Sequence, residues 1–327
     1  MSKPVVVDSG SSRCRAGFSS AEEPRSDFAS AWEGAPSMER GVVTDWDAME
    51  KVLERVYKDL NVSPDGQPIL LTDSPTNPKA NREKMTELVF EKFKPPRMHI
   101  AIGAVLALYS TGNLSGLVLQ SGHGVTHAVP IHQGYAISDG IGRLDLAGHD
   151  LTEALAKRCV VAKATAEAIK EKLAHVALNV DSEKKVEKSY ELPDGKSIAV
   201  GSEMFEVPEA LFEPSRLGVK SCGGVHRLVC DSISKCDDAV GKDLYSKIVL
   251  SGGTTLLPGF DGRLKKEIGA LVASGTTTKI VDNLSSRVYS SWFGGSILAA
   301  LATFDEKWVT KAEYEEAGAV VVHKKCV

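Results

Sequence analysis

The sequence predicts an α/β fold, because short apolar segments typical of strands alternate with longer segments of helical pattern along its 327 residues. Two strand–turn–strand segments, at residues 5–18 and 116–127, share one design, in which a buried strand runs into a turn of Ser and Gly. A third apolar strand, at residues 248–251, runs into Gly252 and Gly253. The chain is long enough to fold as two lobes with large cores.

The first element is the strand at residues 5–7, where three valines precede a turn over residues 9–12. Residues 33–40 are expected to form a short loop, since glycine and proline break regular structure there. Asn77 and Pro78 offer an N-cap and a first-turn proline for a helix. The other elements expected in the first third are helices over residues 44–60, 78–92 and 103–109 and strands over residues 69–72 and 99–102.

Farther along the chain, residues 150–175 have the pattern of one long helix. Asp194 and Gly195 predict the turn of a hairpin over residues 190–198, because Asp-Gly pairs favour tight hairpin turns. The remaining elements expected are a strand near residues 133–137, a helix over residues 261–272, a strand over residues 279–281 and a helix over residues 292–301.

The turn after the first strand has the composition of an anion-binding site. Gly10 can adopt a positive φ, and the small side chains around it let backbone N–H groups point at one spot, which suits phosphate. Asp8, at the end of the strand, suits Mg²⁺ bound through water. One such hairpin is often purely structural, but two of them together with Gly252 and Gly253 indicate two lobes that grip one phosphate chain.

Composition excludes several classes of partner and site. The formal net charge of −4 gives no reason to expect nucleic acid or an anionic membrane as a partner. The six cysteines show no C-x-x-C spacing, so we expect reduced thiols and neither a zinc site nor a disulfide framework. Without a signal segment or an apolar run long enough to cross a bilayer, the sequence predicts a soluble cytoplasmic protein.

Long runs of the sequence resemble actin. The runs that match this family are residues 71–72, 77–85, 124–127, 143–148, 170–173, 187–195, 208–212, 250–255, 294–298 and 322–326. The resemblance covers nearly the whole chain. It implies a fold of two lobes, each built on a βββαβα core, with ATP or ADP and a divalent cation between them. It also implies a cytoskeletal role in which the nucleotide state is coupled to assembly.

The resemblance implies three parts: a first lobe over residues 1–104, a second lobe over residues 105–290, and a return to the first lobe over residues 291–327. The second lobe would hold the second phosphate loop and a nucleoside-binding loop at residues 251–255. Actin has an additional small lobe, with a loop that docks into the next subunit of a filament. Only residues 33–40 span that gap here, so the small lobe is expected to be missing.

Several residues expected at the phosphates differ from the family. His127 matches the histidine that helps to place the attacking water, and the alternative is a core histidine. Gly103 stands where the family has a glutamine that orients this water, and Gln120 and His123 stand where it has two aspartates. Arg15 replaces a phosphate-contacting lysine and keeps its charge. Losing one supporting partner can cost about 10–100-fold in metal affinity or activity, so hydrolysis should be slow or absent.

Two sets of residues are therefore expected to contact the nucleotide. The candidate phosphate-binding residues are Ser9, Gly10, Ser11, Ser12, Arg13, Arg15, Ser121, Gly122, His123, Gly124 and Val125. The candidate nucleoside-binding residues are Gly148, Lys170, Glu171, Gly252, Gly253, Thr254 and Leu257. Two of these have plainer alternatives, since His123 could be a solvent-facing turn residue and Lys170 could belong to a solvated helix face.

These features predict an actin-like protein that binds adenine nucleotide and assembles with copies of itself. The alternatives are a non-polymerising scaffold or capping subunit and an active ATPase with substituted catalytic groups. Lys307 places a charge beside the cleft that receives the docking loop in the family, which makes binders of that cleft doubtful. Arg216 and Lys220 turn an apolar loop over residues 213–220 basic. Any polymer should therefore differ from actin's two-stranded filament.

Overall fold

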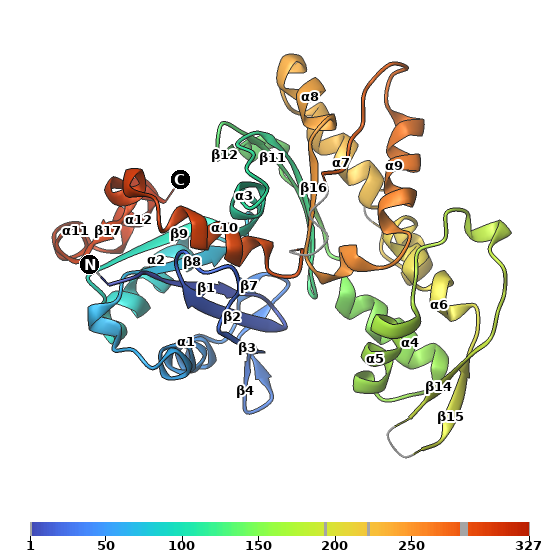
Figure 1. Ribbon diagram of the computed structural model, residues 1–327, viewed down its shortest axis with the longest axis horizontal. Coiled ribbons are helices and arrows are strands. Elements are labelled where there is room, and N and C mark those ends of the chain that lie inside the picture. Colours follow the sequence, from blue (N-terminus) through green and yellow to red (C-terminus); the bar gives the residue numbers. More distant parts are fainter. Residues whose placement is uncertain (1, 193–194, 221–222, 282–286, 327) are drawn as a thin grey trace.

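The computed structural model describes residues 2–192, 195–220, 223–281 and 287–326. Its two main β-sheets lie next to each other, each with helices packed against it (Figure 1). The first sheet has six strands, which in spatial order are β17 (Val309–Thr310), β9 (Arg97–Ile102), β8 (Ile69–Asp73), β1 (Val5–Ser9), β2 (Arg13–Phe18) and β3 (Ser26–Ala29). The second has five, which are β12 (Tyr135–Ala136), β11 (Thr126–His132), β10 (Gly116–Ser121) and β16 (Ile248–Ser251), with β13 (Gly142–Leu144) also paired to β11.

The two sheets share one plan. In the first, β1 pairs antiparallel with β2 and parallel with β8. In the second, β10 pairs antiparallel with β11 and parallel with β16. The three valines of β1 are completely buried, as expected for a central strand covered on both faces. This plan brings the turn after β1, the turn after β10 and the end of β16 to the region between the sheets. The alternation of strands and helices confirms the predicted α/β class.

Helices of the first sheet come from both ends of the chain. Asp45 begins α1 (Trp46–Leu60), where its side chain accepts a hydrogen bond from the Ala48 amide. The buried face of α1 includes Met49, Val52 and Val56, whose spacing of three and four residues is that of one helix face. The other helices here are α2 (Lys79–Leu88), a π-helical turn (Val89–Phe93), α11 (Lys311–Ala317) and α12 (Val322–Lys325). Figure 1 shows both chain ends on this side of the molecule.

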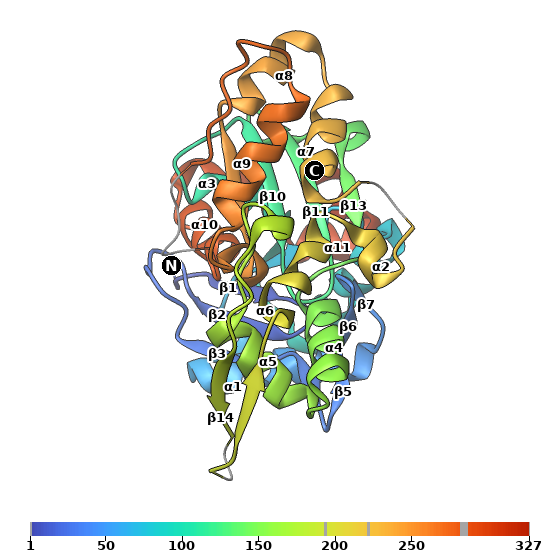
Figure 2. The same ribbon diagram turned by 90° about the vertical axis from the view of Figure 1, so that its right-hand side faces the viewer.

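Most helices on the side of the second sheet lie between β13 and β16 in the sequence, and α9 (Phe260–Leu271) follows β16. These helices are α4 (Gly148–Cys159), α5 (Lys163–Leu173), α6 (Glu203–Glu206), α7 (Val225–Ser234), α8 (Asp238–Tyr245) and α9. A hairpin of β14 (Lys188–Glu191) and β15 (Ser197–Val200) extends away from them in both views (Figures 1 and 2). Among the described residues, no helix is long and apolar enough to cross a membrane.

Two helices cross where the chain passes between the sheets. The chain leaves the first sheet through α3 (Gly103–Tyr109) and returns to it through α10 (Ser290–Leu298). A Cβ atom on Gly294 would lie 1.8 Å from the carbonyl oxygen of Leu106, so the two backbones touch directly. The Trp292 indole donates a 3.0 Å hydrogen bond to the carbonyl of Val6, which fixes α10 to the first sheet.

Several expected elements differ in the structure. Residues 150–175 form two helices, α4 and α5, because the chain turns at Val160 with φ of 54°. The expected loop at residues 33–40 lies within two short hairpins, β4 (Ala31–Trp32) with β5 (Ala35–Pro36) and β6 (Met38–Glu39) with β7 (Val42–Val43). Asn77 does not cap α2, because its side-chain oxygen accepts a hydrogen bond from the Asn81 side chain and the residue before the helix is Pro78. Residues 279–281 form only a single bridge, between Ile248 and Ile280.

Some elements had no counterpart in the sequence analysis, notably β3, α7 and α8. The turn residue Asp194 lies outside the described residues. The five cysteines that the structure describes, Cys14, Cys159, Cys230, Cys236 and Cys326, are free.

Candidate functional site

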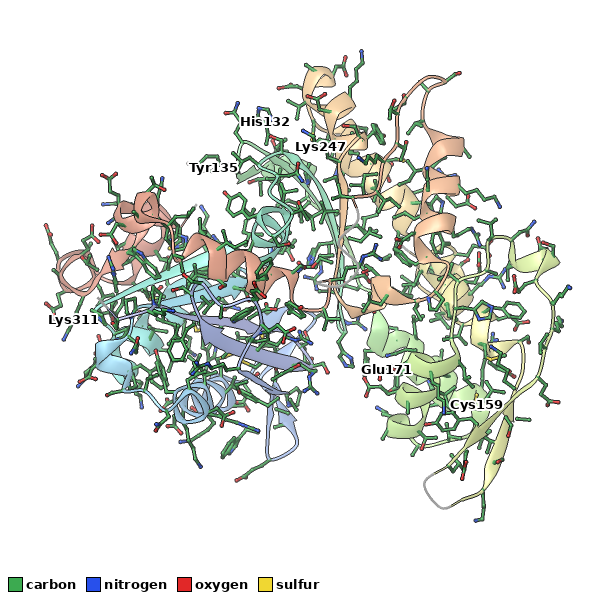
Figure 3. All side chains as sticks on the ribbon, viewed as in Figure 1. His132, Tyr135, Cys159, Glu171, Lys247 and Lys311 are labelled. Carbon is green, nitrogen blue, oxygen red and sulfur yellow. The ribbon has the colours of Figure 1, made fainter. Side chains whose placement is uncertain are left out.

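A cavity of about 600 Å³ lies between the two sheets. The turns after β1 and β10 both line it, together with the start of α4, the end of α5 and the segment that follows β16. Its volume lies within the range of about 300–1,000 Å³ typical of small-molecule sites. Glu171, on the part of α5 that borders the cavity, is labelled in Figure 3.

The structure brings nearly all of the candidate site residues to this cavity. Those that line it are Asp8, Ser9, Gly10, Ser11, Ser12, Arg13, Arg15, Gly122, His123, Gly124, Val125, His127, Gly148, Lys170, Glu171, Gly252, Gly253, Thr254 and Leu257. Ser121 does not, because its side chain is completely buried and its hydroxyl lies 2.7 Å from that of Thr126. Ser121 therefore does not border the cavity with its side chain, and its contact with phosphate stays a prediction.

The first turn presents a carboxylate, hydroxyls and backbone. Asp8 accepts a 2.8 Å hydrogen bond from the Thr72 hydroxyl. Burial raises the pKa of Asp8 above its usual range, although the charge of Arg15 and the bond from Thr72 oppose the rise. A cation next to this buried carboxylate would therefore be stabilised. Gly10 does not adopt the expected positive φ, so the turn forms without a left-handed residue there.

The structure adds a charged cluster to the first turn. Asp27, on β3, lies opposite Arg15 in the pairing of β2 with β3. Its carboxylate accepts a 2.7 Å hydrogen bond from Nε of Arg13 and lies 3.4 Å from Nε of Arg15. All three side chains line the cavity. The sequence analysis missed Asp27 because it did not predict β3. The available signal was the acidic residue within the short alternating segment at residues 26–29.

The second turn is held by backbone contacts. The carbonyl of Gly122 accepts hydrogen bonds from the Gly148 amide and from the Thr254 hydroxyl, at 3.0 and 2.7 Å. Gly252 has φ of 89°, and a Cβ there would lie 2.3 Å from the Ser121 carbonyl, so only glycine fits. The segment after β16 and the second turn are thereby fixed against each other.

His123 borders the cavity and also stands next to a second histidine. Its ring centroid lies 5.1 Å from that of His149, and the His123 carbonyl accepts a hydrogen bond from the His149 amide. Burial lowers the pKa of His123, and the nearby His149 and Lys170 lower it further. The ring is therefore neutral at pH 7.

The groups where catalytic residues were expected are mostly neutral. Nε2 of His127 lies 3.0 Å from the Thr76 hydroxyl, and burial, with help from Arg143, lowers the pKa of His127 to about 4. Gln120 donates from its amide to the Ser291 hydroxyl at 3.1 Å. Gly103 supplies no side chain, and a Cβ there would lie 3.5 Å from the Gln120 amide nitrogen. Hence Gln120 occupies the space beside Gly103.

Lys170 is not part of a solvated helix face. Its ammonium donates to the Gly148 carbonyl at 3.1 Å and to the Thr152 hydroxyl at 2.7 Å. Burial lowers the pKa of Lys170, while Glu167 and Glu171 oppose this change. The lysine thus connects α5 to the start of α4 at the edge of the cavity.

A contact that the sequence analysis did not anticipate connects the two sides of the cavity. Arg40, in the turn between β6 and β7, donates to the carbonyls of Gly124 and Asp145, both at 3.0 Å. Its guanidinium also pairs with the carboxylate of Asp150 at 2.8 Å. The sequence alone could not indicate this contact, because the partners of Arg40 lie more than 80 positions away in the sequence.

The described residues contain no group of three or more His, Cys, Asp or Glu side chains able to enclose a metal ion. The carboxylate of Asp8 still fits Mg²⁺, which retains most of its waters and needs few protein ligands. Hydroxyls and amides of the adjoining turn suit phosphate oxygens. The cavity can thus accept an anionic ligand accompanied by a hydrated cation.

The family comparison agrees with this architecture. The family model described as Actin matches residues 32–163 and 158–327, which together span most of the sequence. The matched part includes the second turn, the segment after β16 and the C-terminal return to the first sheet. With two sheets of one plan around a shared cavity, this chain belongs to the actin family.

Proposed function

We propose that this protein binds an adenine nucleotide, ATP or ADP, in the cavity between its sheets and assembles with copies of itself. The observation that supports the proposal is that the turns after β1 and β10, one from each sheet, line the same cavity of about 600 Å³. The phosphates would contact both turns, and the nucleoside would lie along Gly252, Gly253 and Leu257. A ligand held this way would connect the two lobes, which we place at residues 1–104 with 291–327 and at residues 105–290.

We propose that Mg²⁺ accompanies the nucleotide and is bound through water at Asp8. The ion would supply charge stabilisation for the phosphates. The Thr72 hydroxyl orients the Asp8 carboxylate, and Arg15 supplies a positive charge from the neighbouring strand. Since Gln120 and His123 are neutral, nucleotide binding should depend less on Mg²⁺ than it would in a site rich in carboxylates.

We infer that hydrolysis is slow or absent. His127 is neutral at pH 7, and its Nε2 already lies 3.0 Å from the Thr76 hydroxyl, so orienting a nucleophilic water would fall to the other ring nitrogen. No side chain at Gly103 assists it, and the amide of Gln120 donates to Ser291. ATP should survive incubation with the protein, and phosphate release measured over several hours tests this. Multiple turnovers at a rate typical of actin polymers would instead support an active ATPase.

Assembly would use contacts that differ from those of actin. The two short hairpins between β3 and α1 leave no room for a separate docking lobe. Asp305, near the cleft that would receive a docking loop, pairs with Arg97 at 2.6 Å, and Arg216 in the basic loop pairs with Glu213 at 2.7 Å. Charged groups resist burial in a dry contact, so we propose polymers with altered subunit packing and marked salt sensitivity.

Two measurements test the assembly proposal. Sedimentation with nucleotide at low and high salt separates a polymer from a non-polymerising scaffold or capping subunit. Electron microscopy of the pelleted material then shows its geometry. A strictly monomeric protein at high concentration in every nucleotide state contradicts self-assembly, and a two-stranded filament with actin's geometry contradicts altered packing.

A further inference from the structure

The two arginines of the Arg13–Asp27–Arg15 cluster contact Asp27 in different ways. Arg13 donates two hydrogen bonds to Asp27: Nε donates to the carboxylate at 2.7 Å, and Nη2 donates to the backbone carbonyl at 3.1 Å. The ion pair of Arg15 with the same carboxylate is longer, with Nε at 3.4 Å. Within the described part of the chain, no partner is found for its two terminal nitrogens. The Arg15 side chain is only 14% exposed, whereas that of Arg13 is 49% exposed.

This arrangement prepares Arg15 for an anion. A guanidinium has five N–H donors in one plane, and a phosphate is best bound by two of them in parallel. A carboxylate placed at Nε restrains the plane and leaves the terminal pair available. Holding a long side chain in its binding geometry before the ligand arrives reduces the entropy lost on binding.

We propose that Asp27 is a positioning residue that holds Arg15 for the phosphate end of the ligand, and that Arg13 serves mainly to fix Asp27. The inference rests on the proposed nucleotide site and refines it, because it assigns direct phosphate contact to Arg15 and removes Arg13 from that role. Asp27 therefore acts on the ligand only through Arg15.

The proposal is testable because simple electrostatics predicts the opposite effect of Asp27 on anion binding. The Asp27 carboxylate is a negative charge next to an anion site, so its removal should strengthen anion binding if charge alone mattered. If Asp27 positions Arg15, its removal should weaken binding instead. An asparagine at the same position loses the charge but keeps an oxygen that can accept a hydrogen bond from Nε.

The experiment measures the dissociation constant of a fluorescent ADP analogue, with ADP competition, for the full-length protein and five variants. Arg15→Ala should weaken binding about tenfold or more, in line with loss of a charge-assisted bidentate contact. Asp27→Ala should weaken it about three- to tenfold, while Asp27→Asn should stay within about twofold of the parent protein. Arg13→Ala should have a smaller effect than Arg15→Ala. Asp305→Ala removes a surface ion pair outside the cavity lining and is the matched control, which should bind normally.

Three outcomes would overturn the inference: tighter binding by Asp27→Ala, equal weakening by Asp27→Ala and Asp27→Asn, or unchanged binding by Arg15→Ala. A second readout follows the Nε–H resonance of Arg15 by NMR without ligand, and it should be protected from exchange in the parent and lose protection in Asp27→Ala. Melting temperatures confirm that each variant is folded. If the parent protein binds no nucleotide, the proposed function itself fails, and that result is visible before any variant is compared.

Discussion

Replacing Arg40 should weaken the connection between the two sides of the cavity by a measurable amount. Arg40→Met keeps most of the side-chain stem but removes the guanidinium, which donates to two carbonyls and pairs with Asp150. Each lost hydrogen bond contributes about 0.5–1.5 kcal/mol, so we expect the free energy of unfolding to fall by about 2 kcal/mol. Methionine also keeps a side chain at this position, where φ is 45°, so the backbone strain is nearly unchanged.

A double-mutant cycle separates the ion pair from the other contacts. Asp150→Asn keeps an oxygen for the Ala147 amide, to which Asp150 also bonds at 2.9 Å, while removing the charge. The side chains are 39% and 20% exposed, so the coupling between Arg40 and Asp150 should be near 1 kcal/mol, at the upper end for exposed ion pairs. Urea denaturation of the parent, both single variants and the double variant measures this coupling energy. A coupling energy below about 0.3 kcal/mol, which is within the scatter of additive sites, would refute the assignment.

Three further predictions concern protonation and packing. His99 and His127 both have a pKa lowered to about 4, chiefly by burial, so each folded-state pKa lies below the unfolded value near 6.5. The free energy of unfolding should therefore be highest above pH 6.5 and fall by about 2 kcal/mol per histidine between pH 7 and 5. His127→Gln should reduce this pH dependence, as measured by urea denaturation. Nucleotide binding should tighten as the pH falls through the pKa that His123 has in the complex, because protonated His123 would add positive charge beside the phosphates. An unchanged pH profile of the dissociation constant in His123→Ala would show that the ring does not contribute. Gly294→Ala should destabilise the protein by about 3 kcal/mol because its Cβ meets the Leu106 carbonyl, whereas the exposed Gly269→Ala in α9 should be neutral or stabilising in the same thermal melts.

The parts of the fold that sequence predicts well are those whose cause is local. The three valines of β1 and the apolar strand β10 are buried because of their own composition. The cap at Asp45 and the glycine at residue 252 are likewise determined by the backbone next to them. These local signals, with the resemblance to actin, sufficed to place all but one of the candidate residues at the cavity.

The features that the sequence analysis did not predict depend on contacts between distant parts of the chain. Val160 ends α4 in a left-handed conformation that a β-branched residue seldom adopts, so no local preference could reveal the break. Ser121 looked like a turn residue, but it pairs with Thr126 in the β10–β11 ladder and is buried there. Asp27 and Arg40 acquire their roles from partners on other elements, and a single sequence contains no record of such pairings.

The direct contact between α3 and α10 has a mechanical consequence. Both links between the sheets pass through this crossing, and no side chain separates Gly294 from the Leu106 carbonyl. Helices that touch backbone to backbone cannot slide past each other without a clash, but they can still rotate slightly about the point of contact. Any change in the angle between the two sheets would therefore have to be a rotation about this contact, and it would have to break the hydrogen bonds of Arg40 across the cavity.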